Sequence, residues 1–201
     1  MTLVEIDASG TQLTRLQRWS HYLTILVCVL GLLYGLNIRQ SLLEATIPYT
    51  NTQAGISLRY PANWLIDEDG DSYVFRVRDM TRIGFKTTIQ ISVEPVGAAT
   101  SPQNVLNGLT LQRATQLAQY NTLSVESTDV FDFDNQISMT YFFTTSDVDA
   151  ALEPIPTVVI GHDVLVVLRG QAIIVTFRSD AATFEQDSTI FDRFLGTLDL
   201  Q

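Results

Sequence analysis

Cysteine is nearly absent from the sequence, whose single cysteine is Cys28. Because Cys28 lies within an apolar run, the part of the chain that follows cannot form an internal disulfide, and we expect its fold to depend on packing alone. A lipid-modified cysteine follows a small residue, whereas Val27 precedes Cys28. We therefore interpret Cys28 as a residue that faces lipid or packs against a helix.

Histidine is almost as scarce, with His21 in the apolar run and His162 beyond it. A hydrolytic triad needs a nucleophile beside a base, and a zinc site needs several cysteine or histidine ligands. We interpret His21 as an interfacial residue, and His162, between Gly161 and Asp163, as a turn residue at the tip of a hairpin. No glycine-rich phosphate loop follows a strand. The sequence therefore predicts no catalytic residues, no cofactor and a protein that is not an enzyme.

Basic residues are the third scarcity. From Gln40 onward, nine Lys and Arg residues stand against twenty Asp and Glu residues, which gives this part of the chain a formal charge of −11. Nucleic acids and anionic lipid surfaces attract clustered Lys and Arg side chains. The charge balance therefore excludes nucleic acid as an expected partner.

Charged residues are missing altogether from Trp19 to Leu36, a run bounded by Arg18 and Arg39. As a helix this run spans about 27 Å, close to the ~30 Å of a bilayer's hydrocarbon core. No small-residue cleavage pattern follows it, so we expect a retained single-pass transmembrane helix over residues 19–38 rather than a cleaved signal.

The charges that flank this helix predict its orientation. Arg15 and Arg18 precede it and Arg39 follows it, which favours a cytoplasmic N-terminus. We therefore predict a cytoplasmic tail at 1–18, a linker at 39–50 and an extracytoplasmic domain at 51–201, held at the cell membrane.

The extracytoplasmic part alternates apolar and polar residues in the manner of strands. We expect strands near 55–60, 73–77 and 85–93, a hairpin over 123–143, and three apolar strands at 157–160, 164–168 and 172–177. Ser101 and Pro102 predict the start of a helix of about 18 residues that includes Arg113 and Tyr120, and a last helix begins with Asp180 as its cap. This order predicts the α+β class, as an α-β-α sandwich with a mostly antiparallel sheet, preceded by one N-terminal transmembrane helix.

One acidic turn holds the candidate metal ligands Asp67, Asp69 and Asp71. Alternating carboxylates offer oxygen ligands to a hard cation such as calcium. The spacing departs from that of a helix-loop-helix calcium loop, because Gly70 comes early and Arg78 occupies the twelfth position. A solvated turn is the alternative interpretation.

A small basic group follows this turn and consists of Arg76, Arg78, Arg82 and Lys86. In an otherwise acidic domain, these residues are candidates for a docking patch that contacts an acidic partner or a lipid headgroup. The alternative is that they cover the sheet edge with paired or solvated charge.

Three segments of the domain resemble the PsbP family. They are GISLRYPANW at 55–64, RGQAIIVTF at 169–177, and Phe184 with the closing FDRFL at 191–195, together with the long central helix. That family includes the extrinsic protein of the photosystem II oxygen-evolving complex and bacterial DcrB-like relatives, and the resemblance covers about 49–200. It implies an α-β-α sandwich that acts as a binding or assembly module beside a membrane complex. The photosystem protein is soluble, whereas this chain has a predicted anchor, and no metal-binding histidine of the family aligns here.

Two function hypotheses follow. The first is a single-pass, membrane-anchored, non-catalytic binding module that docks on, assembles or stabilises a larger membrane protein complex, of photosynthetic or respiratory type. The second is an extracytoplasmic sensor domain that binds a solute or ion, either in a pocket between sheet and helix or at the turn of Asp67.

Overall fold

The computed structural model describes residues 15–43, 45–67, 70, 72–97, 99–131, 133, 136–146 and 156–200. The chain divides into two compact units, Met1–Ala45 and Thr46–Gln201. The first unit contains helix α1 (Arg15–Leu43), in which the stretch Trp19–Arg39 has a mean hydropathy of 1.8. Its described side chains from Trp19 to Arg39 are all exposed. This stretch is long and apolar enough to cross a membrane.

The segment 39–50, for which we expected a linker, divides between two regular elements. Helix α1 extends to Leu43, and strand β1 already begins at Thr46. Glu44 and Ala45 alone separate these two elements along the chain.

The second unit is built on an antiparallel sheet of seven strands, in the spatial order β3-β4-β5-β9-β8-β7-β6. These strands are β3 (Leu65–Ile66), β4 (Phe75–Arg78), β5 (Thr88–Pro95), β6 (Ala118–Thr128), β7 (Gln136–Ser146), β8 (Pro156–Leu168) and β9 (Gln171–Asp180). A small second sheet has the order β1-β2-β10, from β1 (Thr46–Asn51), β2 (Ile56–Pro61) and β10 (Asp199–Leu200).

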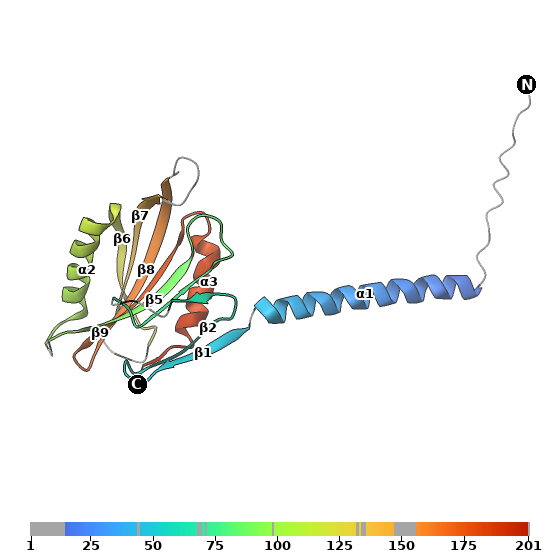
Figure 1. The fold of residues 1–201 in the computed structure, drawn as a ribbon, viewed down its shortest axis with the longest axis horizontal. Helices are drawn as coiled ribbons and strands as arrows, with labels where there is room; N and C mark the ends of the chain where they lie inside the picture. The colour runs from blue at the N-terminus through green and yellow to red at the C-terminus, as the bar shows by residue number, and fades with distance from the viewer. Residues whose placement is uncertain are drawn as a thin grey trace, which may run out of the picture. The chain divides into compact units, whose positions relative to one another are not determined.

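Helices cover both faces of the large sheet, with α2 (Pro102–Gln116) on one side and α3 (Phe184–Leu195) on the other (Figure 1). The larger core lies on the α3 side, where Phe177, Phe191 and Phe194 pack among side chains of β2, β4, β5, β8 and β9. A smaller core under α2 contains Leu106, Met139, Tyr141, Phe143 and Val159. The α+β class and the antiparallel α-β-α arrangement are thus confirmed.

The prediction of a hairpin tip at Gly161, His162 and Asp163 is wrong. Strand β8 runs without interruption through these residues, and each pairs with both neighbouring strands. Long-range packing explains this, because the ring of Tyr141 fills the space that a side chain at position 161 would take. The true turn is at Arg169 and Gly170, both with positive φ, which join β8 to β9 in a two-residue loop.

The two helix predictions need corrections at their ends. The hydroxyl of Ser101 accepts a hydrogen bond from the backbone N–H of Asn104, which confirms the predicted N-cap of α2. The helix ends at Gln116, however, and Tyr120 belongs to β6, which pairs with β7. Helix α3 begins after Thr183 rather than at Asp180, because Asp180 still belongs to β9.

Candidate functional site

Helix α2 covers only part of the sheet face on which it lies. It packs on β6, β7 and β8, whereas β9, β5 and β4 extend beyond it. The side chains that these three strands turn toward the α2 side are mostly polar, which is unusual for a face that would otherwise be buried in a sandwich. The part of the sheet left uncovered by α2 is therefore a polar surface.

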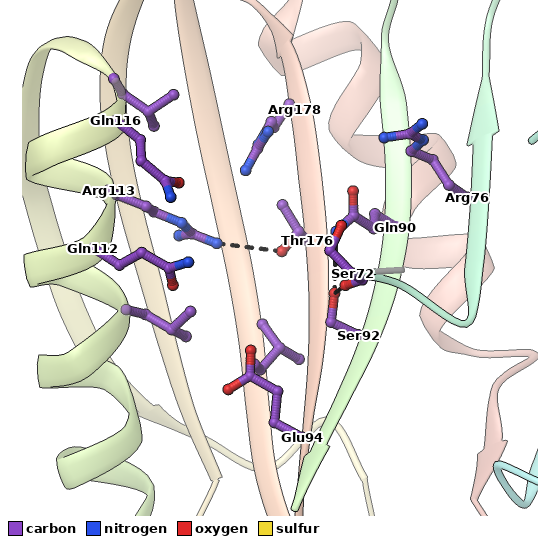
Figure 2. Close-up of a pocket in the computed structure, with 13 residues that line it drawn as sticks. Ser72, Arg76, Gln90, Ser92, Glu94, Gln112, Arg113, Gln116, Thr176 and Arg178 are labelled. Atoms are coloured by element: carbon purple, nitrogen blue, oxygen red, sulfur yellow. Dashed lines mark hydrogen bonds between the residues drawn. The ribbon is translucent and has the colours of Figure 1, made fainter. Parts of the chain in front are cut away.

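A groove with a volume of about 280 Å³ lies between α2 and this polar surface (Figure 2). Its walls come from α2 on one side and from β4, β5, β9 and the turn before β4 on the other. The lining residues are Ser72, Arg76, Gln90, Ser92, Glu94, Leu109, Gln112, Arg113, Gln116, Leu117, Ile174, Thr176 and Arg178. We refer to this site as the α2 groove.

A second hollow of about 260 Å³ adjoins the α2 groove along the helix. The two hollows share Glu94, Leu109 and Gln112. Both hollows are lined by residues of α2, and we refer to the two together as the channel beside α2.

Arg113 anchors α2 to the sheet at the floor of the groove. Its two terminal nitrogens donate to the two carboxylate oxygens of Asp163 in β8, and Nη2 also lies 3.4 Å from Thr176 Oγ1. Arg113 is 6% exposed and Asp163 is 0% exposed. Burial disfavours the charged guanidinium, but the neighbouring carboxylate outweighs that effect and raises the pKa of Arg113 above its ordinary value.

Tyr141 connects this ion pair to Arg178. The guanidinium of Arg113 lies 4.5 Å from the centre of the Tyr141 ring, and Arg178 Nε donates to the Tyr141 hydroxyl oxygen at 3.2 Å. Burial raises the pKa of Tyr141 to about 12. The hydroxyl therefore stays neutral at physiological pH and cannot neutralise Arg178.

The two outer arginines of the groove differ in their partners. Arg76 Nε forms an ion pair with Asp67 Oδ2 at 2.8 Å, and its guanidinium lies 4.1 Å from the centre of the Tyr73 ring. Arg178 lies 5.8 Å from the centre of the Phe143 ring but forms no ion pair with any carboxylate among the residues that the structure describes. Arg178 is thus the groove-lining arginine that pairs with no carboxylate in the described part of the domain.

Of the three candidate metal ligands, the structure describes Asp67, whereas Asp69 and Asp71 lie outside the described residues. Both oxygens of Asp67 accept hydrogen bonds from guanidinium groups, Oδ2 from Arg76 at 2.8 Å and Oδ1 from Arg78 at 2.7 Å. Burial would raise the pKa of Asp67, but the bonds from Arg78 and Arg76 lower it overall. A cation at this carboxylate would have to displace two arginines, and the three-residue metal site remains a prediction.

The four predicted docking residues do not form one patch of free charge. Arg76 and Arg78 share Asp67 at one place, and Arg82 pairs with Asp187 and with Asp79 at another. Lys86 donates to the backbone oxygen of Arg82. Only Arg76 of the four lines the α2 groove, and the docking role of the group remains a prediction.

The carboxylate of Asp187 holds the start of α3 against the sheet. It is 0% exposed, and its Oδ2 accepts hydrogen bonds from the hydroxyls of Thr87, Ser179 and Thr183 at 2.9, 2.6 and 3.0 Å. Because every partner of this carboxylate lies within the domain, the cluster supports the fold rather than a ligand.

The arginines and carboxamides that line the α2 groove are donors suited to an anion, and Glu94 adds one carboxylate to the same lining. Guanidinium groups and carboxamides donate hydrogen bonds to carboxylates, and arginine does so with two parallel bonds. Among the described residues, no group of three or more His, Cys, Asp or Glu side chains is placed to hold a metal ion. His162 faces away from the groove, against Phe191 of α3, with its Nδ1 2.9 Å from Thr140 Oγ1.

No pattern in the sequence marks Arg178, Gln90 and Thr176 as site residues. One signal was present in the sequence. Arg113 lies at helical spacing from Leu106, Leu109 and Leu117, which places it on the apolar side of the helix, and a buried cation there requires a buried carboxylate as its partner. Twenty acidic residues after Gln40 offered no way to choose Asp163.

Comparison with known proteins supports the fold. No protein-family profile and no curated protein sequence matches the chain. Among solved structures, cyanobacterial PsbP (CyanoP) from Synechocystis sp. PCC 6803 is similar at a TM-score of 0.53 and 13% identity, over 78% of this chain and 93% of that one. The Ran-binding protein Mog1p of Saccharomyces cerevisiae is similar at a TM-score of 0.51 and 8% identity, over 78% and 95%. The domain therefore has a PsbP-like fold.

Proposed function

We propose that this protein is a single-pass, membrane-anchored, non-catalytic binding module whose C-terminal domain docks on, assembles or stabilises a larger membrane protein complex. The observation that carries this proposal is the apolar helix Trp19–Arg39, followed after Leu43 by two residues and then by the first strand of a PsbP-like domain. A tether this short keeps the domain close to the membrane surface, where membrane protein complexes present their exposed parts.

The polar, open groove of the domain also supports a binding role. Small-molecule sites in enzymes are largely apolar clefts that enclose the ligand. The α2 groove instead presents guanidinium, carboxamide and hydroxyl groups on a sheet face that α2 leaves uncovered. In this proposal the N-terminus is cytoplasmic and the domain extracytoplasmic, in accord with the order of Arg15, Arg18 and Arg39.

The alternative function, a solute sensor, has one observation in its favour, namely the groove of about 280 Å³ between helix and sheet. The ion-binding form of that alternative is less well supported, because Arg76 and Arg78 occupy both oxygens of Asp67.

The proposal is tested by purifying the full-length protein from its native membrane in mild detergent and identifying the proteins that accompany it by mass spectrometry. Recovery of a membrane complex in fixed stoichiometry is the expected result. The matched control carries an unrelated transmembrane helix in place of 19–39 and should recover the same complex, because the domain provides the specificity. If the control and the native protein each emerge alone, the binding module is not supported and solute screening takes its place.

A further inference from the structure

Arg178 has hydrogen-bonding capacity that its surroundings do not use. Nε bonds to the Tyr141 hydroxyl, and no bond to the terminal nitrogens is formed among the described residues. In the described part of the chain, Arg78 Nε is the buried side-chain nitrogen or oxygen that lacks a hydrogen-bond partner. The terminal nitrogens of Arg178 also lack a partner in this part of the chain but are not among the buried atoms, so they are accessible from solvent. Arg178 lines the groove, where a ligand can reach these donors.

Figure 2 shows how the walls of the groove face one another. Arg113, Gln112 and Gln116 extend from α2 toward the sheet, and Arg178 and Gln90 come from the strands opposite. Arg113 is already neutralised by Asp163, so the added charge of a ligand would be met by Arg178. The carboxamides can donate to or accept from a peptide backbone, which alternates N–H and C=O groups.

The shape of the channel fits an extended segment. The α2 groove continues into the neighbouring hollow past Glu94 and Leu109, along the inner side of the helix. Gly108 lies on this stripe between Asn104 and Gln112, and a Cβ at Gly108 would meet no atom within 4 Å. A glycine inside a helix costs stability relative to alanine, and packing does not require one here. Because Gly108 has no side chain, the space beside the helix at this position stays unfilled.

We propose that the α2 groove binds an acidic peptide segment of the partner protein, whose carboxylate pairs with Arg178. This inference rests on the proposed function and names the chemistry of its docking site. Charge complementarity supports it, since the groove gathers guanidinium groups in a part of the chain whose formal charge is −11, so an acidic segment meets attraction here and repulsion elsewhere. Glu94 sets the orientation, with the acidic residue toward Arg178 and uncharged residues toward Glu94.

A direct test uses two labelled peptides of equal length and the full-length protein in detergent. The probes are the C-terminal amides of fluorescein-Gly-Asp-Glu-Asp-Gly and fluorescein-Gly-Asn-Gln-Asn-Gly, which carry the same label and differ only in their acidic side chains, titrated by fluorescence anisotropy at low salt. We expect the acidic peptide to bind at least about tenfold more tightly than the Asn/Gln peptide, with an affinity that falls as salt rises. Equal binding of the two peptides, or binding of neither, overturns the proposal.

Three variants locate the site. Arg178→Gln should weaken the acidic peptide by about tenfold or more, Arg178→Lys should retain part of the affinity, and Arg193→Gln should bind as the native protein does. Arg193 is the matched control, because it is an exposed arginine on α3 at the other face of the sheet. Equal affinity of the Arg178→Gln variant and the native protein contradicts the assignment.

A steric variant tests the groove without changing its charge. Gly108→Leu places a side chain in the channel and should reduce peptide affinity by about tenfold, while Gly108→Ala should reduce it less. Circular dichroism and the fluorescence of buried Trp64 confirm that each variant is folded. Native affinity in Gly108→Leu would show that the peptide lies elsewhere and would overturn the proposal.

Two further measurements separate this inference from the proposed function and from the solute sensor. If citrate displaces the labelled acidic peptide at concentrations similar to those of the unlabelled peptide, the groove is a site for small acids and the peptide-docking proposal is overturned. In purification from native membranes, loss of the complex in Arg178→Gln supports both proposals. If the native protein and the Arg178→Gln variant both recover the complex, the binding module is supported, but the α2 groove is not its docking site.

Discussion

Arg113 in α2 and Asp163 in β8, fifty residues further along the chain, form a buried ion pair in which both guanidinium terminal nitrogens meet both carboxylate oxygens. This contact fixes α2 on the sheet and thereby sets one wall of the α2 groove. Removing one partner leaves a charge that is buried and uncompensated, which costs more than the pair itself contributes.

Asp163→Asn should therefore lower the free energy of unfolding by about 3–5 kcal/mol. Urea unfolding of the full-length protein in detergent measures this, with Trp64 fluorescence as the signal in a Trp19→Phe background. Exposed Asp129 supplies the control, because Asp129→Asn should stay within about 0.5 kcal/mol of the native value. A loss below about 1 kcal/mol in Asp163→Asn would show that the pair does not hold α2 in place.

The stability of the domain should decrease as the pH falls below neutrality, because of His162. Burial lowers the pKa of His162 below its ordinary value of 6.5, so near and below that pH the unfolded chain binds a proton more readily than the folded one. The stability that comes from keeping the ring of His162 neutral is fully present above pH 6.5. It is lost as the pH falls from 6.5 to the lower pKa that His162 has in the folded protein. His162→Gln should flatten the unfolding free energy between pH 7.5 and 5.

His21→Gln is the control for this titration, because the same change is then made in α1 and outside the domain. The titration of Asp67 does not interfere. Because the pKa of Asp67 is lowered, its effect on the unfolding free energy is confined to pH values below its ordinary pKa of 3.8. Parallel pH profiles for His162→Gln and the native protein would contradict the account.

Gly161→Ala should destabilise the domain by about 1–3 kcal/mol through overpacking. A Cβ at position 161 would lie 2.1 Å from Cζ of Tyr141, whose ring is held by Tyr120, Phe143 and the bond from Arg178. Thermal unfolding followed by circular dichroism measures the effect. Gly108→Ala is the matched control with the opposite sign, an expected gain of about 0.5–1 kcal/mol, because its Cβ meets nothing and alanine favours the helix. A neutral Gly161→Ala would mean that Tyr141 moves freely.

The orientation in the membrane can be tested because Cys28 is the single cysteine. In a Cys28→Ala background, Gln186→Cys on exposed α3 should react with a membrane-impermeant maleimide added to intact cells. Ser9→Cys in the N-terminal tail should react after the cells are opened. The reverse pattern would place the domain in the cytoplasm.

Local patterns were sufficient to predict much of the fold. Alternation of apolar and polar residues predicted strands β2, β4 and β5, because one face of each lies on the core and period-two burial leaves a clear record. Ser101 and Pro102 predicted the start of α2, since capping depends on neighbours within one turn.

Local sequence patterns did not predict the contacts between residues that are distant along the chain. Gly161 and Asp163 have the composition of a turn, yet one makes room for Tyr141 and the other neutralises Arg113. The α2 groove escaped for the same reason, because its walls come from α2, β4, β5 and β9, and only the strand order brings Arg178 opposite Gln112 and Gln116. The pairing of the basic candidates also depends on the fold, because Arg76 and Arg78 pair with Asp67 whereas Arg82 pairs with Asp187.

The central claim is that the domain acts by binding a membrane complex, and the size of the particle that carries the protein tests it most directly. After extraction of native membranes in mild detergent, native gel electrophoresis of the tagged full-length protein should show a particle far larger than the 22.4 kDa chain in its micelle. That particle should contain other membrane proteins in fixed ratio. Migration of all the protein as a free chain, over a range of mild detergents, would contradict the claim.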